Sequence, residues 1–271
     1  MKVAIIGAGI CGLYLARKLA ERGEDATVFE KKNKIGKEVC SGLFSERILE
    51  FVPESRDLIQ NQINYTLIHF PHRTLKIRFS KKFLVMNHAA LDRLVASLAE
   101  KSGAKILLNS PKTVLELSHD FERIIGCDGA LSKTREILKL EKPEFYLGIQ
   151  GMEGSMKFPS SPPSLSLRES SVVEAWPTQN GFIWKIPRGR NVEWGIMERP
   201  DSANKIFYDF LAKNNIRLEN QQAWLIPQGL VIPRNDEITL IGDAAGLTKP
   251  WSGGGVIWGL TAADILLKNF P

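Results

Sequence analysis

The stretch that decides the fold is residues 2–30, KVAIIGAGICGLYLARKLAERGEDATVFE. It opens with a short β-branched apolar run, Lys2–Ile6, which predicts a buried parallel strand. Apolar residues at helical spacing follow over Leu13–Arg22. A second strand, Ala26–Phe29, then leads to Glu30. This order of strand, glycine-rich turn, helix and strand is typical of a βαβ unit that binds a dinucleotide.

The glycines of this unit have separate expected roles. Gly7 permits the tight turn, Gly9 lets backbone approach a pyrophosphate, and Gly12 lets the helix pack closely on the strand. The start of the helix presents unpaired N–H groups to phosphates, and Glu30 is placed to accept hydrogen bonds from a ribose. The cofactor-binding residues predicted here are Gly7, Gly9, Ile10, Cys11, Gly12, Glu30 and Lys31.

The composition is that of a globular protein. The 271 residues are 44% hydrophobic and 24% charged, enough for one large domain or two interleaved ones. Three widely spaced cysteines argue against a disulfide framework and for a reducing compartment. No apolar run reaches the ~18 residues of a membrane span. The first strand starts at once, which leaves no room for a cleaved signal, so we expect a cytoplasmic protein.

The charge balance bears on partners. A net charge of +6 suits an anionic partner, such as cofactor phosphates, a lipid head group or an acidic membrane face. Lys and Arg are scattered and do not alternate with aromatic residues, so we expect no nucleic-acid partner. The four histidines lack metal-ligand spacing, so we expect no metal site.

The rest of the chain alternates between strand and helix patterns. Helices are expected from Ser45–Leu49 onward, over Ala89–Lys101 and over residues 203–214 and 256–268. Strands are expected within 62–85 and over residues 105–108, 113–117, 123–126, 146–151, 164–167, 172–176, 182–186, 192–197, 230–232 and 238–241.

Two further glycine–acid signatures and one cysteine loop follow the first fingerprint. The signatures are Asp128-Gly129 and Gly242-Asp243, the second of which precedes Pro250 and the run Gly253-Gly254-Gly255. The loop is Gly36-x-x-x-Cys40-Ser41-Gly42.

Together these elements resemble the para-hydroxybenzoate-hydroxylase-like flavoproteins and, within them, the geranylgeranyl reductase family, over residues 1–268. The resemblance implies FAD extended across a Rossmann-type domain, with Asp243 on the ribityl chain and Pro250 and the three glycines against the flavin ring. Phe182-x-Trp184-x-Ile186-Pro187 and Gly195-x-Met197 resemble the substrate-domain motif Tyr-x-Trp-x-Phe-Pro…Gly-x-Gly. The FAD contacts that the resemblance adds are Gly36, Cys40, Ser41, Gly42, His88, Asp128, Gly129, Gly242, Asp243, Pro250, Gly253, Gly254 and Gly255.

The chain departs from the family pattern in several places. Phe182, Ile186 and Met197 replace the motif's Tyr, Phe and second Gly. His88 stands where the family usually has Arg, and a neutral imidazole would grip a phosphate less firmly. Family members also commonly continue beyond the position of Pro271, so we expect a compact version with an open site or one completed by a partner.

Several residues keep two interpretations. Cys40 could deliver a proton to a double bond as hydride arrives, or could pack against the flavin ring. Asp243 could bind the cofactor or cap the following turn. Aromatic side chains could line a slot for a prenyl chain or form sheet core, although Trp184 and Trp251 are placed near the flavin by motif. The predicted catalytic residues are Cys40 and Trp184.

The expected fold is α/β, with a Rossmann-like FAD domain (1–61, 86–142 and 225–271) and an inserted antiparallel β-rich substrate domain (62–85 and 143–224). The resemblance implies FAD-dependent reduction of C=C bonds in a hydrophobic, isoprenoid or lipid substrate. NAD(P)H or a ferredoxin-like donor would recharge the flavin, and peripheral membrane contact stays open. The alternatives are an aromatic-type FAD monooxygenase, although Gly246 follows Gly-Asp-Ala-Ala where hydroxylases usually have His, and a flavin-binding subunit without independent activity.

Overall fold

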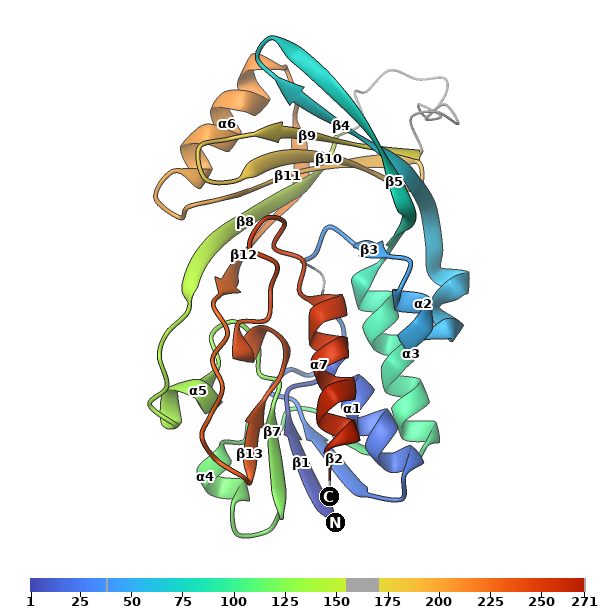
Figure 1. Ribbon diagram of the computed structural model, residues 1–271, viewed down its shortest axis with the longest axis vertical. Coiled ribbons are helices and arrows are strands. Elements are labelled where there is room, and N and C mark those ends of the chain that lie inside the picture. Colours follow the sequence, from blue (N-terminus) through green and yellow to red (C-terminus); the bar gives the residue numbers. More distant parts are fainter. Residues whose placement is uncertain (38, 155–170, 271) are drawn as a thin grey trace. The chain divides into compact units, whose positions relative to one another are not determined.

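The computed structural model describes residues 1–37, 39–154 and 171–270 (Figure 1). The chain forms two compact units, each made of separated segments. Unit 1 comprises Met1–Glu38, His88–Glu144 and Pro227–Pro271, and unit 2 comprises Val39–Asn87 and Phe145–Ile226. Residues 39–61, which the sequence assigned to the FAD domain, therefore lie in unit 2. The reason is that β3 (Leu43–Ser45) pairs with β5 (Arg73–Met86).

Unit 1 is built on a five-stranded sheet in the order β13-β7-β1-β2-β6, and every pairing in it is parallel. Its centre is fully buried, because β1 contributes Val3, Ala4 and Ile5 with no exposed surface. All carboxyl ends of parallel strands meet at one edge, which is where such sheets bind ligands. The strands are β1 (Lys2–Ile6), β2 (Asp25–Phe29), β6 (Lys105–Leu107), β7 (Arg123–Gly126) and β13 (Ile238–Leu240), as the sequence predicted.

The helices of unit 1 pack around this sheet. The first, α1 (Ile10–Glu21), contacts both α3 (His88–Lys101) and α7 (Val256–Lys268), and the three lie side by side in Figure 1. Its apolar residues Leu13, Leu15 and Leu19 are fully buried. The shorter helices are α4 (Val114–Leu117), α5 (Lys133–Ile137) and the 3-10 helix η3 (Gly242–Ala245).

Three expectations for local structure are wrong. Thr113–Leu117 was expected to be a strand, but Thr113 and Glu116 form a reciprocal capping box that starts α4. Residues 230–232 form no strand, and the side chains of Leu230 and Ile232 are exposed. Ser45 ends strand β3, and the helix expected there, α2 (Ile48–Phe51), begins three residues later.

Unit 2 is built on an eight-stranded sheet in the order β12-β8-β11-β10-β9-β4-β5-β3. Its pairings are antiparallel as predicted for β10 with β11 and β9, β11 with β8, and β5 with β4 and β3. However, β4 and β9 pair in parallel, so the sheet is mixed. The strand predicted at 164–167 lies outside the described residues. The remaining strands are β4 (Ile59–Phe70), β8 (Glu144–Glu153), β9 (Val172–Pro177), β10 (Phe182–Arg188), β11 (Asn191–Glu198) and β12 (Leu218–Gln228).

Two separate cores lie in unit 2. Helix α6 (Ala203–Lys213) buries Phe207 against a cluster that includes Ile196 and Trp194. Trp184 belongs to the other cluster, with Ile63, Val85 and Ile186 among its members. Helix α2 and the 3-10 helix η1 (Pro53–Leu58) join β3 to β4.

The ring of Trp184 packs on the backbone of Gly195, and replacing Gly195 tests this packing. A Cβ on Gly195 would lie 2.2 Å from Cζ2 of Trp184 and 2.7 Å from the carbonyl oxygen of Ile149, so Gly195→Ala should cost about 2–3 kcal/mol of unfolding free energy. Gly154→Ala is the control, because its Cβ would meet only the side chain of Glu219. Urea unfolding measures both. A loss below about 0.5 kcal/mol for Gly195→Ala would contradict the packing.

Candidate functional site

The glycine-rich turn after β1 has the geometry that its sequence predicted. Gly7 has a φ of +107°, and a Cβ there would lie 2.4 Å from the carbonyl oxygen of Cys127. A Cβ on Gly12 would lie 2.2 Å from the carbonyl oxygen of Gly7. Gly9, in contrast, has nothing within 4 Å of its Cβ position. Gly7 and Gly12 therefore pack against protein backbone, whereas the space beside Gly9 is free for a ligand.

Glu30 stands at the end of β2 beside this turn. One carboxylate oxygen accepts a hydrogen bond from the N–H of Ala8 at 2.8 Å, and the other accepts one from the N–H of Lys32 at 2.9 Å. An ionised carboxylate has about four acceptor sites, so both oxygens keep capacity for a ribose. Lys31 is exposed next to it.

The Asp128-Gly129 element follows the carboxyl end of β7. Asp128 accepts hydrogen bonds from the N–H of Thr134 at 2.9 Å and from its hydroxyl at 3.1 Å, so one oxygen of this carboxylate holds the turn before α5. Its other oxygen is buried and has no hydrogen-bond partner within the described part of the chain. Gly129 has a φ of +85° and an open Cβ position.

A buried arginine joins the middle and C-terminal signatures. Arg135 is 4% exposed and donates to the carbonyl of Ala244 at 2.9 Å and to that of Ala130 at 2.6 Å. Burial lowers the pKa of Arg135, although the charge of Asp128 opposes this shift. Through Arg135 the backbone after β7 is tied to η3, so the two glycine–acid elements lie in one cluster.

The C-terminal signature places Asp243 beside the glycine run. A Cβ on Gly255 would lie 3.0 Å from Oδ1 of Asp243, whereas the Cβ position of Gly254 is open apart from Ser252 at 3.6 Å. Gly253 has a φ of +65°, and Pro250 is exposed. The alternative role of Asp243 as a helix cap is wrong. Ile241 is the N-cap of η3, Gly255 is that of α7, and no side chain caps either helix.

Cys11 is a packing residue. Its Sγ lies 3.1 Å from the Cβ position of Gly242 and 2.5 Å from that of Gly259 on α7, so the thiol fills the space beside both glycines. Burial raises the pKa of Cys11 to about 12, and the charges of Asp243 and Asp92 add to the effect. This thiol is therefore neutral at physiological pH and joins α1 to α7.

A polar chain links the Gly36 turn to Asp243. Gly36 has a φ of +124° and packs on Ala89 of α3. The next residue, Lys37, donates its backbone N–H to Oδ2 of Asp92 at 2.8 Å and places Nζ 3.3 Å from Oδ2 of Asp243. His88 is 5% exposed, with Nε2 3.3 Å from Oδ1 of Asp92. His88 is thus engaged with a buried carboxylate, and its predicted contact with FAD stays a prediction.

The residues of unit 1 fit a dinucleotide cofactor. The unpaired N–H groups at the start of α1 suit a pyrophosphate, Glu30 keeps acceptor sites for a ribose, and Gly9 and Gly254 leave open backbone where side chains would obstruct a ligand. Asp243 and Lys37 add a carboxylate and an ammonium at the same sheet edge. A flavin dinucleotide needs these groups along its length.

The part of the cysteine loop from Cys40 to Gly42 lies in unit 2. The Sγ of Cys40 accepts a hydrogen bond from the N–H of Gly42 at 3.4 Å, and the carbonyl of Cys40 lies 3.5 Å from Nε2 of Gln150. Nη1 of Arg188 donates to the carbonyl of Ser41 at 2.8 Å and to that of Met86 at 3.2 Å. Gly42, at a φ of +62°, makes room for this guanidinium, since a Cβ there would lie 1.7 Å from Nη1.

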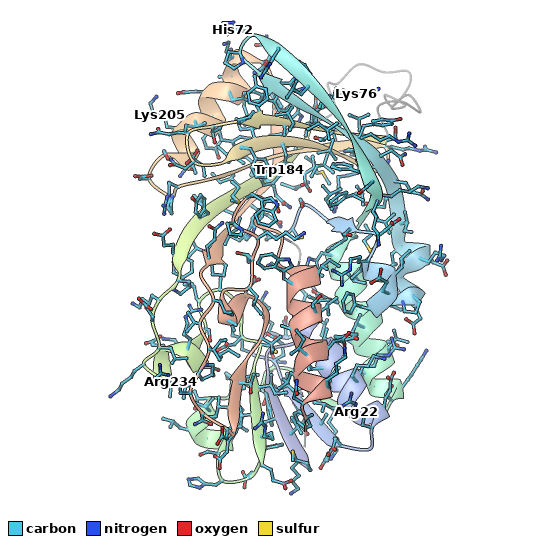
Figure 2. The ribbon with its side chains drawn as sticks, viewed as in Figure 1. Arg22, His72, Lys76, Trp184, Lys205 and Arg234 are labelled. Atoms are coloured by element: carbon cyan, nitrogen blue, oxygen red, sulfur yellow. The ribbon has the colours of Figure 1, made fainter. Side chains whose placement is uncertain are left out.

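Trp184 is labelled in Figure 2. It is 6% exposed, and its indole N–H donates to Oε1 of Glu193 at 3.2 Å. Glu193 is 1% exposed, and its Oε2 lies 3.7 Å from Nε of Arg188. Burial raises the pKa of Glu193 to about 7, while the Arg188 charge and the Trp184 hydrogen bond oppose the shift and the charge of Cys40 adds to it. The motif residue Trp184 thus holds a buried acid near the cysteine loop.

The other tryptophans divide between core and surface. Trp176 and Trp194 belong to the α6 core, with ring centroids 5.4 Å apart, as the sheet-core interpretation predicted. Trp251 is 68% exposed in unit 1 and meets Trp258 edge-on at 6.0 Å. The catalytic roles of Trp184 and Cys40 and the FAD contacts stay predictions.

Sequence reasoning missed the supporting side chains, namely Lys37, Asp92, Arg135, Gln150, Arg188 and Glu193. A signal existed for two of them: Lys37 follows the predicted loop glycine, and Glu193 lies two residues before the motif glycine Gly195. Within the described ranges no helix is long and apolar enough to cross a membrane.

Glu30→Gln tests the ribose assignment. The amide keeps one acceptor oxygen for the turn but removes the charge, so FAD binding should weaken about tenfold, or ~1.4 kcal/mol, with the fold intact. Flavin fluorescence titration of the apoprotein measures the dissociation constant. Glu21→Gln, on the exposed side of α1, is the matched control. Equal FAD affinity in Glu30→Gln and the wild type would remove Glu30 from the site.

Comparisons with known proteins agree with this geometry. Residues 5–45 match the family model described as an NAD(P)-binding Rossmann-like domain. The chain is 25% identical to a digeranylgeranylglycerophospholipid reductase of Methanococcus vannielii, over 98% of this chain and 77% of the relative.

Solved structures share the fold. A geranylgeranyl bacteriochlorophyll reductase-like protein of Thermoplasma acidophilum has a TM-score of 0.78 at 18% identity, over 99% of this chain and 79% of that chain. A flavin-dependent halogenase of Xanthomonas campestris has a TM-score of 0.76 at 14% identity, over 100% and 71%. The resemblance predicted from the motifs is confirmed: over 98% of its length the chain is similar in sequence to a protein named digeranylgeranylglycerophospholipid reductase, and it shares its fold with a geranylgeranyl bacteriochlorophyll reductase-like protein.

Proposed function

We propose that this protein is an FAD-dependent oxidoreductase that reduces carbon–carbon double bonds of an isoprenoid lipid. The observation that carries the proposal is the Cys40-Ser41-Gly42 loop, which is held by Arg188 next to Trp184 and Glu193 of the substrate motif. The relatives named as digeranylgeranylglycerophospholipid reductases match over 98% of this chain and support the substrate class.

The cofactor would be held by unit 1. The N–H groups at the start of α1 would bind the pyrophosphate, Glu30 the adenosine ribose and Asp243 the ribityl hydroxyls, with the Gly253–Gly255 backbone against the ring. FAD, when bound and reduced, supplies an electron pair to the alkene as hydride. The remaining requirement of the reaction is a proton for the second alkene carbon.

Cys40 is our candidate for that proton donor. The thiol is half-buried, whereas Cys11 is buried and packed, and burial raises the pKa of Cys127 well above its usual value. A thiol that donates its proton becomes a thiolate, which the N–H of Gly42 stabilises by its hydrogen bond to Sγ. The thiolate then regains a proton from water. Hydride and proton together add one molecule of hydrogen across the double bond.

The alternative of an aromatic-type monooxygenase is disfavoured by one position. Hydroxylases usually have His after Gly-Asp-Ala-Ala, but here Gly246 has a φ of +70° and a Cβ there would lie 2.1 Å from the carbonyl oxygen of Gly229. A side chain at this place would collide with backbone. The flavin-dependent halogenase shares the fold, so the fold alone does not choose between reductase and oxygenase.

The electron donor is proposed as NAD(P)H or a ferredoxin-like protein. The Rossmann-like match covers residues 5–45, which is the segment that we assign to FAD. It therefore gives no reason to assign a separate nicotinamide site. The donor that bleaches the bound flavin without oxygen, when each is added in turn, would be identified as the electron donor.

Cys40→Ser should retain FAD but lose alkene reduction by about 100-fold, because a hydroxyl is a far weaker acid than a thiol. The assay reduces the flavin without oxygen and follows its reoxidation by a geranylgeranyl lipid. Cys127→Ser is the control, because burial raises the pKa of Cys127 well above its usual value and holds it neutral. Unchanged turnover in Cys40→Ser would remove Cys40 from the mechanism, and oxygen consumption with NADPH would favour the monooxygenase.

The β4–β5 hairpin is our candidate for contact with the membrane that carries such a lipid. Residues 59–86 contain no Asp or Glu and five basic residues, Arg73, Lys76, Arg78, Lys81 and Lys82. Near its tip Phe70, Leu75 and Ile77 are exposed by 38–43%. The register places Phe70 opposite Arg73 and Ile68 opposite Leu75, so these apolar side chains share a face.

Figure 2 shows His72 at the turn of this hairpin and Lys76 on β5. Arg73 shares the face of these exposed apolar side chains, and the other charged residues of the hairpin are also cations. This combination matches the chemistry of an anionic bilayer surface. We therefore propose a cytoplasmic protein that docks reversibly on anionic lipid.

Arg73→Gln combined with Lys76→Gln tests this surface. Each cation near an anionic bilayer contributes ~1 kcal/mol, so the double variant should bind anionic vesicles roughly thirtyfold more weakly. Sedimentation with vesicles of phosphatidylglycerol and phosphatidylcholine measures binding, which should also fall with added salt. The control removes two cations of α6, Lys205→Gln and Lys213→Gln, in the same unit. Equal losses of vesicle binding in both double variants would show that net charge, and not the hairpin, causes the binding.

A further inference from the structure

A buried carboxyl group lies behind the cysteine loop. Glu193 is 1% exposed on β11, and among the described residues the cation in ion-pair contact with it is Arg188, whose Nε lies 3.7 Å away. Nε of Arg188 has no hydrogen bond to any described residue. Arg188 and Glu193 therefore form an ion pair without a hydrogen bond between Nε and the carboxylate. A buried acid is costly unless it serves the structure or the site.

The arginine connects this acid to the loop. Its Nη1 donates to the carbonyl of Ser41 at 2.8 Å and to that of Met86 at 3.2 Å, which fixes the residue next to Cys40. The loop is shaped around the guanidinium, because a side chain on Gly42 would occupy the position of Nη1. The turn after Arg188 is anchored as well, since the N–H of Gly189 donates to Oδ1 of Asn61 at 2.7 Å.

The groups that surround Glu193 come from three elements. Arg188 and Trp184 face it from β10, and the same Arg188 donates to the carbonyl of Ser41, the neighbour of Cys40 in the loop. The charge of Cys40 raises the pKa of Glu193. On β8 the neighbouring polar side chain is the neutral amide of Gln150, which reaches the carbonyl of Cys40. The glutamate, the arginine and the thiol therefore form one electrostatic cluster within unit 2.

We propose that Glu193 is a positioning residue for Cys40: it holds Arg188 on the cysteine loop, and the charge of its carboxyl group restrains the reactivity of the thiol. Electrostatic interaction is reciprocal, so a thiolate that disfavours ionised Glu193 is itself disfavoured by it. Arg188 opposes both effects. A proton held by Glu193 would thus favour ionisation of Cys40, and its loss would favour the thiol.

The sign of the pH dependence follows. Glu193 titrates near a pKa of about 7, so it is mostly neutral at about pH 6 and mostly ionised at about pH 8.5. Glu193→Gln is neutral throughout and keeps an acceptor oxygen for the indole N–H of Trp184. The variant and the wild type should then have similar thiolate fractions at the lower pH and diverge at the higher pH.

The experiment measures alkylation of Cys40 by iodoacetamide in the apoprotein, with each cysteine quantified by peptide mass spectrometry. Glu193→Gln should leave the rate unchanged at about pH 6 and raise it about tenfold at about pH 8.5, which corresponds to a pKa of Cys40 lower by about one. Glu153→Gln is the matched control, since Glu153 also accepts an indole N–H, that of Trp194 at 2.9 Å, in the other core. Parallel wild-type and Glu193→Gln profiles at every pH would overturn the proposal.

Two further measurements guard against misfolding. The wild-type profile should itself bend near about pH 7 as Glu193 ionises, which needs no variant. Arg188→Gln should increase hydrogen exchange of the loop amides, and Arg188→Lys should restore only part of the protection. Unchanged exchange in Arg188→Gln would contradict the positioning role.

The catalytic consequence rests on the proposed function. If Cys40 donates a proton, easier ionisation in Glu193→Gln should move the alkaline limb of kcat to lower pH, with little change in KM. Alkylation without flavin and alkene reduction with flavin are independent readouts. A positive first result with no alkene reduction in the wild type would reject the function and leave the coupling intact.

Discussion

The structure of unit 1 depends on the absence of side chains where three parallel strands end. After β1, a Cβ on Gly7 would meet the backbone that follows β7, and a Cβ on Gly12 would meet the turn itself. After β13, Gly242 leaves only the space that the thiol of Cys11 fills. Because backbone packs on backbone here, the strand ends approach closely enough for their polar groups to serve one ligand. Arg135 then satisfies two of the carbonyls that this packing buries.

Glycines also allow close packing in unit 2, but there they make room for large side chains and not for backbone. Gly195 gives way to the ring of Trp184, and Gly42 gives way to the guanidinium of Arg188. In each case a glycine in a motif exists because a large side chain occupies the position of its Cβ. The cysteine loop and the degenerate substrate motif, which look independent in the sequence, are joined by Arg188 and Glu193. Trp184 and Gly195 both take part in this junction, because Gly195 makes room for the ring and Glu193 accepts the indole N–H.

Much of the fold could be predicted from sequence, because the parallel strands and long helices have strong periodic patterns. The failures have physical causes. Thr113–Leu117 is β-branched and apolar like a strand, but the capping box of Thr113 and Glu116 stabilises a helix there. Strand β12 is an edge strand with polar residues, so its pattern was too weak to be recognised. The glycines and acids of the candidate site could be found by motif. Lys37 and Glu193 had only their places beside motif glycines as a signal, and Arg135 had none, because their roles depend on contacts between distant segments.

We propose that segments far apart in the chain converge on one flavin. Hydrogen exchange of the apoprotein with and without FAD, resolved by peptide mass spectrometry, tests this most directly. The account predicts that FAD protects amides in three separate regions, the turn at Gly7–Gly12, the Asp128-Gly129 turn and the run from Gly242 to Gly255. Protection confined to the first region, or no protection in any of them, would contradict it.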